Sequence, residues 1–425
     1  MSNKLNRVEI GPNFFFNSII DKRYKSNRIS VNLFVPLEES TATEYALLSG
    51  VLGKSTKKYP QLMMVNRKLE ELYGASLSSD ILKIGELQSV SVHMTFIGNK
   101  YALYGENILQ ESINFLCEVL LNPNVENGAF LSSEVEIEKV RLAELIDSEI
   151  NNKRGYAISQ CSKIMCKGER FAIPRYGDKE SLNKITPEGL YHAYKTLLSK
   201  ARIEIFYVGS DPAKLVLDGL REPLLSINRQ PLSEINTSIY PQVPQVKRVD
   251  ETMDIQQAKL VMGFKAGDAK SVEDNTAMMM AMMIFGMSPS SKLFVNVREK
   301  LQLCYYCDAR YDKYKCLLFV DSGIEFANRQ LAEDEILKQL SAVQQGDFTS
   351  KDLQTALMYF QNSYRFVFDA PRMVEAYYLG QVMSDAVKDP DEMIDIASNV
   401  TKEHIMKICQ DIKLDTVYCL AGTEV

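Results

Sequence analysis

Histidine is scarce in this sequence of 425 residues, which holds only His93, His192 and His404, no two of them close together. A zinc site on a helix needs two imidazoles about four residues apart, because that spacing puts both on one helical face. A catalytic zinc also needs about three protein ligands and an open position for water. We therefore expect no helical two-histidine site, no cofactor and no catalytic residue; a zinc site would require distant histidines to converge with carboxylates.

Eight cysteines are the other candidate ligands or nucleophiles. Cys304 and Cys307 form a CxxC, and Cys161 and Cys166 lie five residues apart. The segment around the CxxC is typical of a strand, whereas a thioredoxin-like motif enters a helix. Redox chemistry or a zinc knuckle is an alternative for this pair, but the sequence contains no second CxxC to complete a four-cysteine site. We predict free thiols that pack as small buried hydrophobic groups.

A third signal lies in residues 46–60, which read ALLSGVLGKSTKKYP. This segment resembles the first helix of the M16 (pitrilysin-like) zinc peptidases, in which His-x-x-Glu-His precedes a Lys-Gly-Thr-like turn. When residues 54–56 are placed on that turn, the zinc positions fall on Ala46 and Gly50 and the catalytic base falls on Ser49. None of these side chains can bind zinc or activate water as the family does, so the resemblance implies an emptied metal motif.

Two further segments carry the resemblance. Residues 138–144 are similar to the family segment whose final glutamate is the third zinc ligand, which would make Glu144 a leftover ligand. The spacing of Glu144 from Ile137 and Val140 favours an inward-facing carboxylate, although a glutamate-rich exposed helix is the alternative. Residues 290–305 resemble the second-half motif in which Arg298 and Tyr305 would face the substrate. The alternative is an arginine paired with a nearby glutamate and a tyrosine in the core.

The order of elements repeats along the chain, which indicates two similar domains. An apolar strand, a helix and a second helix follow each other in residues 29–73 and again in residues 258–303. The repeat predicts an α+β fold of two M16-type domains, each a mostly antiparallel sheet with helices packed on it. We expect an N-terminal domain at 1–226, a proline-containing linker at 227–250 and a C-terminal domain at 251–425. The methionine-rich segment 275–285 is apolar on every side, which favours a buried helix over a peptide-binding surface.

Composition limits the classes of partner. The net charge is −6 with no basic block, which argues against nucleic acid, and no apolar stretch is long enough for a membrane span. We expect a cytoplasmic protein. The emptied helix together with the retained Arg298 and Tyr305 resembles the zinc-free subunit of M16 heterodimers, which implies an active His-x-x-Glu-His partner and a peptide or unfolded polypeptide substrate. The alternative is a stand-alone peptide-binding or scaffold protein, as a single chain or a homodimer. An enzyme with another kind of site is a third possibility.

Overall fold

The computed structural model describes residues 4–232, 236–269, 271–384 and 386–422. Its contacts divide the chain into two compact units. Unit 1 contains Met1–Asp147, Ile173–Asn236 and Val367–Val387, and unit 2 contains Ser148–Ala172, Thr237–Phe366 and Lys388–Val425. Across the described residues, none of the helices combines the length and the apolar character needed to cross a membrane.

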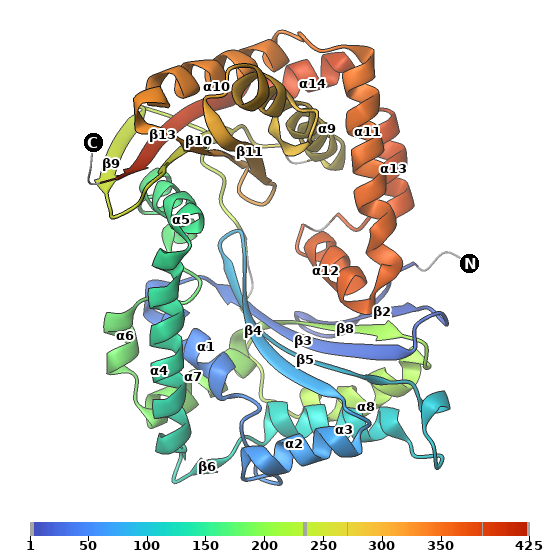
Figure 1. Ribbon diagram of the computed structural model, residues 1–425. Helices are drawn as coiled ribbons and strands as arrows, with labels where there is room; N and C mark the ends of the chain where they lie inside the picture. Colours follow the sequence, from blue (N-terminus) through green and yellow to red (C-terminus); the bar gives the residue numbers. More distant parts are fainter. Residues whose placement is uncertain (1–3, 233–235, 270, 385, 423–425) are drawn as a thin grey trace. The chain divides into compact units, whose positions relative to one another are not determined.

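Unit 1 is built on a six-stranded sheet in the order β1-β2-β8-β3-β5-β4 (Figure 1). Only β2 and β8 pair in parallel, and the other neighbours are antiparallel. The apolar run in β3 explains its central place, because this strand is buried on both faces and paired on both sides. The strands are β1 (Asn6–Gly11), β2 (Phe14–Ile20), β3 (Ser26–Pro36), β4 (Ser76–Ile84), β5 (Leu87–Ile97) and β8 (Arg202–Gly209).

One face of this sheet carries the main core of unit 1, which contains apolar side chains from α1, α3, α7 and α8. The helices of this unit in the first half are α1 (Glu39–Val51), α2 (Leu62–Glu71), η1 (Asn99–Tyr101), α3 (Ile108–Leu121), α4 (Ser132–Ser148), α6 (Lys179–Lys184), α7 (Pro187–Lys200) and α8 (Ala213–Leu225). A short hairpin of β6 (Val125–Glu126) and β7 (Ala129–Phe130) precedes α4.

The opposite face of the same sheet is covered by α12 (Pro371–Val382), a helix from the second half of the chain (Figure 1). Val374, Tyr378 and Val382 form a second core with Phe34 and Phe206 from the sheet. Arg28 in β3 also pairs with Glu375 in α12. Unit 1 is therefore completed by a segment that lies far away in sequence.

Unit 2 repeats this topology. Its five-stranded sheet has the order β9-β13-β10-β12-β11, and β9 and β13 form the parallel pair as β2 and β8 do in unit 1. The strands are β9 (Lys247–Thr252), β10 (Ala258–Ala266), β11 (Cys304–Asp312), β12 (Leu317–Ile324) and β13 (Ile412–Ala421). The same strand order and directions in both units confirm the predicted α+β fold with two similar domains.

The helices of unit 2 include a segment from the first half of the chain. Cys161 and Met165 of α5 (Lys153–Met165) pack with Val261 and Phe319 of the sheet. The other helical segments are η2 (Glu149–Asn151), η3 (Arg170–Ala172), α9 (Val272–Met282), η4 (Met283–Met287), η5 (Leu293–Lys300), η6 (Phe326–Asn328), α10 (Arg329–Gln344), α11 (Ser350–Arg365), α13 (Pro390–Ser398) and α14 (Lys402–Cys409), with η7 (Phe366–Asp369) leading from unit 2 into α12.

Several local features differ from the sequence-based expectation. α4 and α5 are separate helices, because the Asn152 side chain caps a new helix by accepting a hydrogen bond from Gly155 N. The N-terminal hairpin β1–β2 was not expected. β9 occupies the end of the segment expected as a linker, in which residues 233–235 lie outside the described residues. The methionines of α9 are buried as expected, and Ser271 caps that helix.

Candidate functional site

Helix α1 presents the three positions at which the metal motif would lie. It is largely buried, and its residues include Ala46, Ser49 and Gly50. The hydroxyl of Ser49 donates a hydrogen bond to the carbonyl oxygen of Ala46 at 2.8 Å, so its hydrogen bond stays within the helix. Neither a methyl group nor a glycine can donate electrons to a metal, so this surface of α1 offers no ligand set for zinc.

A carboxylate nevertheless lies against this helix. Glu138 is 5% exposed and belongs to the buried stripe of α4, together with Val135 and Leu142. A Cβ atom added to Gly50 would come 2.5 Å from Glu138 Oε2. The absence of a side chain at Gly50 therefore allows the carboxylate to approach the backbone of α1.

Lys54, which follows the C-terminus of α1, provides the counter-charge. Its Nζ lies 2.8 Å from Glu138 Oε1, and Arg141 Nη1 lies 3.7 Å from Glu138 Oε2. A buried carboxylate is costly unless it is paired, so the ammonium group offsets the cost of burying Glu138. One turn earlier on α4, burial raises the pKa of Glu134, and the positive charge of Lys54 partly offsets this effect.

Lys54, Glu138 and Arg141 line a cavity of about 400 Å³ within unit 1. Side chains from α1, α2 and α4 form part of its wall, and β4 contributes residues Leu77, Ser78, Ser79, Asp80 and Ile81. Apolar side chains such as Leu62, Val65 and Leu145 share the lining with the charged groups. The cavity thus combines an apolar wall, a charged cluster and an edge strand of the sheet.

The position of Glu144 differs from the expected one. Its side chain is exposed, and the residues used to predict its inward face, Ile137 and Val140, are 65% and 61% exposed. The inward carboxylate of α4 is Glu138. The three-four spacing of Val135, Glu138 and Leu142 was the available signal, because those positions share one helical face.

Arg298 and Tyr305 line a second cavity, of about 390 Å³, within unit 2. Arg298 lies in η5 with its guanidinium carbon 4.7 Å from the centre of the Phe294 ring and its Nε 3.6 Å from Glu299 Oε1. Tyr305 is 64% exposed at the start of β11, so it is not a core residue. The remaining lining residues are Glu299, Gln302, Leu303, Cys304, Glu325 and Asn328. Arg298 and Tyr305 thus line the same cavity, and their role in substrate binding stays a prediction.

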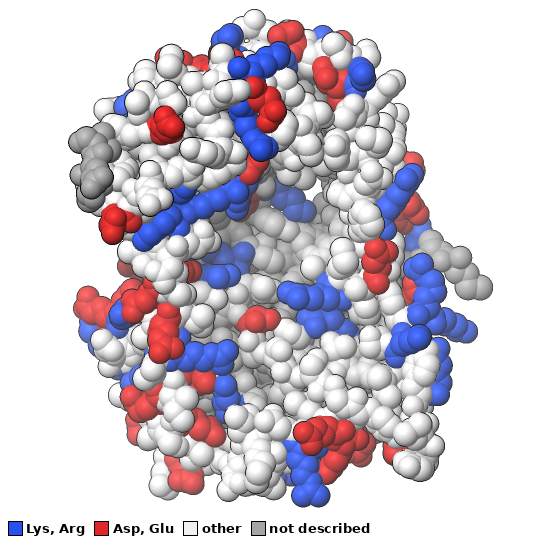
Figure 2. Space-filling view, in the orientation of Figure 1, with Lys and Arg blue, Asp and Glu red and all other residues white. Residues whose placement is uncertain are grey.

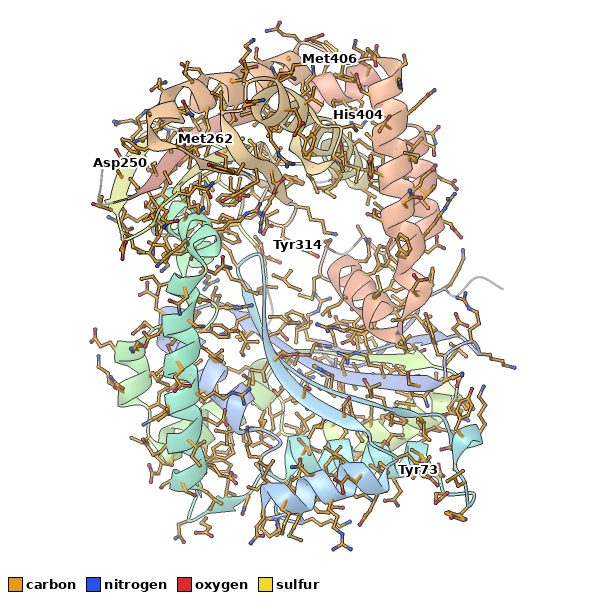
Figure 3. All side chains as sticks on the ribbon, viewed as in Figure 1. Tyr73, Asp250, Met262, Tyr314, His404 and Met406 are labelled. Atoms are coloured by element: carbon orange, nitrogen blue, oxygen red, sulfur yellow. The ribbon has the colours of Figure 1, made fainter. Side chains whose placement is uncertain are left out.

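The three histidines occupy separate elements. His93 Nδ1 lies 3.8 Å from Asp80 in unit 1, and burial lowers the pKa of this histidine. His192 lies on α7, also in unit 1. In unit 2, His404 on α14 contacts Asp274 through Nε2 at 2.9 Å (Figure 3). Within the described ranges, no group of three or more His, Cys, Asp or Glu side chains is placed to hold a metal ion.

Comparison with known proteins agrees with this geometry. Residues 184–359 match the family described as the peptidase M16 inactive domain. The chain is 29% identical over 403 residues to the probable inactive metalloprotease YmfF of Bacillus subtilis (strain 168), covering 95% of this chain and 94% of the relative. The middle of the chain is therefore similar to the peptidase M16 inactive domain, and most of its length is similar to a relative named as a probable inactive metalloprotease.

Solved M16-like structures share the whole fold. A conserved protein from Enterococcus faecalis V583 superposes with a TM-score of 0.91 at 25% identity, covering 100% of both chains. A peptidase M16 inactive domain from Pseudomonas fluorescens gives a TM-score of 0.80 at 15% identity, covering 99% of this chain and 98% of the other. The zinc that the M16 family implies does not fit the residues of α1 here, because Ala46 and Gly50 carry no donor side chain and the nearby Glu138 carboxylate pairs with Lys54.

Proposed function

We propose that this M16-like chain is a non-catalytic subunit that binds a peptide in an extended conformation and supplies Arg298 and Tyr305 to the metal site of an active partner subunit. The observation that carries the peptide-binding part is the position of β4, an edge strand that also lines the cavity beside the emptied helix. Because a strand added to a sheet edge satisfies the backbone of the peptide, it binds without demanding a particular sequence.

The hairpin between β4 and β5 indicates which backbone groups of β4 are available. Ile84 and Leu87 flank a two-residue turn in which Gly85 has a φ of 56°. The pair that flanks such a turn is hydrogen-bonded, and hydrogen-bonded residues alternate along an antiparallel ladder. Leu77, Ser79 and Ile81 therefore direct their backbone N–H and C=O groups away from β5, toward the side on which a peptide would add.

Arg298 and Tyr305 supply the chemistry proposed for the second half. A guanidinium and a phenol are hydrogen-bond donors, and donors directed at a peptide carbonyl stabilise the negative charge that develops on its oxygen during hydrolysis. Both side chains are exposed and line one cavity, so they are accessible to a peptide held by a partner. This arrangement supports a role in assisting a metal site that this chain does not itself carry.

The test is to mix this protein with a His-x-x-Glu-His homologue and to measure peptide cleavage. We expect the mixture to be more active than the homologue alone, and Arg298→Ala to lower kcat by about 100-fold, the usual cost of losing one oxyanion donor. Arg365→Ala, at the exposed end of α11, is the matched control for the loss of a surface charge. No gain in activity on mixing would contradict the proposal.

The peptide-binding edge is tested separately with Ser79→Pro. Proline removes the outward N–H of an edge strand at little cost to the sheet, because that group is not used in the ladder. We expect weaker binding of a fluorescent extended peptide and an unchanged melting temperature. Ser79→Ala, which keeps the N–H, should bind as the wild type does.

The second candidate is a stand-alone peptide-binding or scaffold protein, either a monomer or a homodimer. The edge strand supports peptide binding in either case. Solution mass measured alone and with the homologue separates the two candidates, because a scaffold would give the same mass in both samples.

A further inference from the structure

Strand β11 contains a bulge that changes the side of the sheet to which the cysteines of its CxxC sequence point. Cys304 pairs with Ile324, Tyr306 with Gly323 and Cys307 with Ser322, so the register shifts at Tyr305. Side chains alternate between the faces of a strand, and residues three apart normally point in opposite directions. The extra residue in the bulge corrects this offset, so Cys304 and Cys307 face the same side of the sheet.

The two thiols share one face of the strand but differ in environment. The hydrogen bond from Cys307 lowers the pKa of Cys304, and the Arg298 guanidinium adds to this effect. The same hydrogen bond and burial hold the pKa of Cys307 well above its usual range. Cys304 lines the cavity of Arg298 and Tyr305, whereas Cys307 is 3% exposed. Cys304, at 9% exposed, is thus the more exposed and the more acidic of these two buried thiols.

The other cysteines provide a contrast within the same chain. All eight are free thiols, and burial raises the pKa of Cys117 to about 11 and of Cys409 to about 12. Cys161, Cys166, Cys316 and Cys419 also have raised pKa values caused first by burial. Because the thiolate is the reactive form, Cys304 stands apart from the remaining seven.

We propose that Cys304 and Cys307 form a reversible dithiol–disulfide pair that is oxidised by hydroperoxides. The Cys304 thiolate attacks the peroxide, the O–O bond breaks, and Cys304 becomes a sulfenic acid as the hydroperoxide leaves as an alcohol, or as water from hydrogen peroxide. The Cys307 thiol then attacks the Cys304 sulfur, the S–S bond forms, and the hydroxyl group leaves as water. The two thiols supply two electrons, and a dithiol reductant reverses the reaction.

Closing this bond would change the cavity of unit 2. The disulfide would link Cys304 to Cys307, with Tyr305 between them. The bulge that presents the Tyr305 phenol would then have to change its conformation. If the pocket binds peptide as proposed above, oxidation would weaken that binding; this consequence rests on the proposed function, whereas the disulfide itself does not.

The test uses the full-length protein, reduced, freed of reductant and treated with hydrogen peroxide before alkylation with N-ethylmaleimide. Trypsin releases both thiols in one peptide, residues 301–310, because Lys300 precedes it and Arg310 ends it. We expect this peptide to lose two hydrogens and both N-ethylmaleimide adducts, and to regain both adducts after treatment with dithiothreitol. Two alkylated thiols after peroxide treatment would overturn the proposal.

Single variants test the assigned order of attack. Cys307→Ser should leave a sulfenic acid on residue 304 that dimedone traps, and Cys304→Ser should leave residue 307 unmodified. Equal trapping at both positions would contradict the assignment, and Cys304→Ala checks it if the serine variant fails to fold. Peptide affinity is then compared between the reduced and oxidised wild type. Equal peptide affinity of the reduced and oxidised forms would overturn only the claim that oxidation weakens binding. If neither form bound peptide, that result would count against the proposed function and not against the disulfide.

Discussion

The carboxylate of Glu138 lies against the backbone of Gly50, where a Cβ atom would come 2.5 Å from Oε2. A carboxylate from α4 thus approaches the emptied position of α1 and is neutralised there by Lys54. In this chain the Lys54 ammonium pairs with a carboxylate that would otherwise be available as a metal ligand.

Gly50→Ala should destabilise the protein, because the new methyl group would displace the Glu138 carboxylate from Lys54. We expect a loss of about 1–3 kcal/mol in the free energy of unfolding, the usual range for an overpacked site. Denaturant unfolding measures this loss. In a Glu138→Ala background the same change should be neutral or stabilising, since alanine favours a helix over glycine by about 1 kcal/mol. Equal effects in the two backgrounds would contradict the steric explanation.

Lys54→Met should leave the charge of Glu138 buried and poorly compensated. Breaking a buried pair costs about 3–5 kcal/mol, and the partial exposure of Lys54 reduces our expectation to about 2 kcal/mol. The double variant Lys54→Met/Glu138→Gln removes the unpaired charge and should recover most of the loss. A double variant as unstable as Lys54→Met would show that the lysine acts in another way.

Restoring the ligands should create a zinc site that uses Glu138. We expect the wild-type protein to purify without stoichiometric zinc, and Ala46→His/Ser49→Glu/Gly50→His to bind it, because the two imidazoles would share one face of α1 beside this carboxylate. Metal content measured by mass spectrometry is the readout. Adding Glu138→Gln to this variant should weaken zinc binding, whereas adding Glu144→Gln should not.

Glu134 gives a pH dependence whose sign follows from its raised pKa. The folded state holds the proton more tightly than the unfolded state, so this group favours folding below its unfolded pKa. That contribution is lost as the pH rises through the folded pKa. Glu134→Gln should therefore raise the melting temperature at pH 7, and the difference from wild type should shrink toward pH 4. A constant difference across this range would exclude the titration of Glu134 as the cause.

Residues 1–236 should not fold properly alone, because α12 covers apolar side chains of their sheet. Without it, Phe34, Phe206 and Val208 lose their partners Val374, Tyr378 and Val382. We expect this fragment to bind the dye ANS strongly, and the same fragment extended by residues 367–387 through a flexible linker to bind much less. Comparable dye binding by the two fragments would contradict this role for α12.

The sequence predicted the fold better than it predicted the site. The apolar runs of β3 and β10 and the equal spacing of the following helices reveal the repeat directly, because they reflect local periodicity. The emptied positions on α1 and the shared cavity of Arg298 and Tyr305 likewise follow from short motifs. Glu138 was missed because a buried charge depends on Lys54, which is distant in sequence. The bulge at Tyr305 depends on the pairing of β11 with β12, and local periodicity cannot show that pairing.

The exchange of α5 and α12 between the halves has a consequence for synthesis on the ribosome. Unit 1 begins at the N-terminus, yet one of its covering helices is translated only after most of unit 2. Until residue 387 leaves the exit tunnel, one face of the first sheet lacks its cover. A nascent chain of this protein therefore exposes an uncovered apolar sheet face through most of its translation. We expect chaperones that bind nascent chains on the ribosome to bind this face.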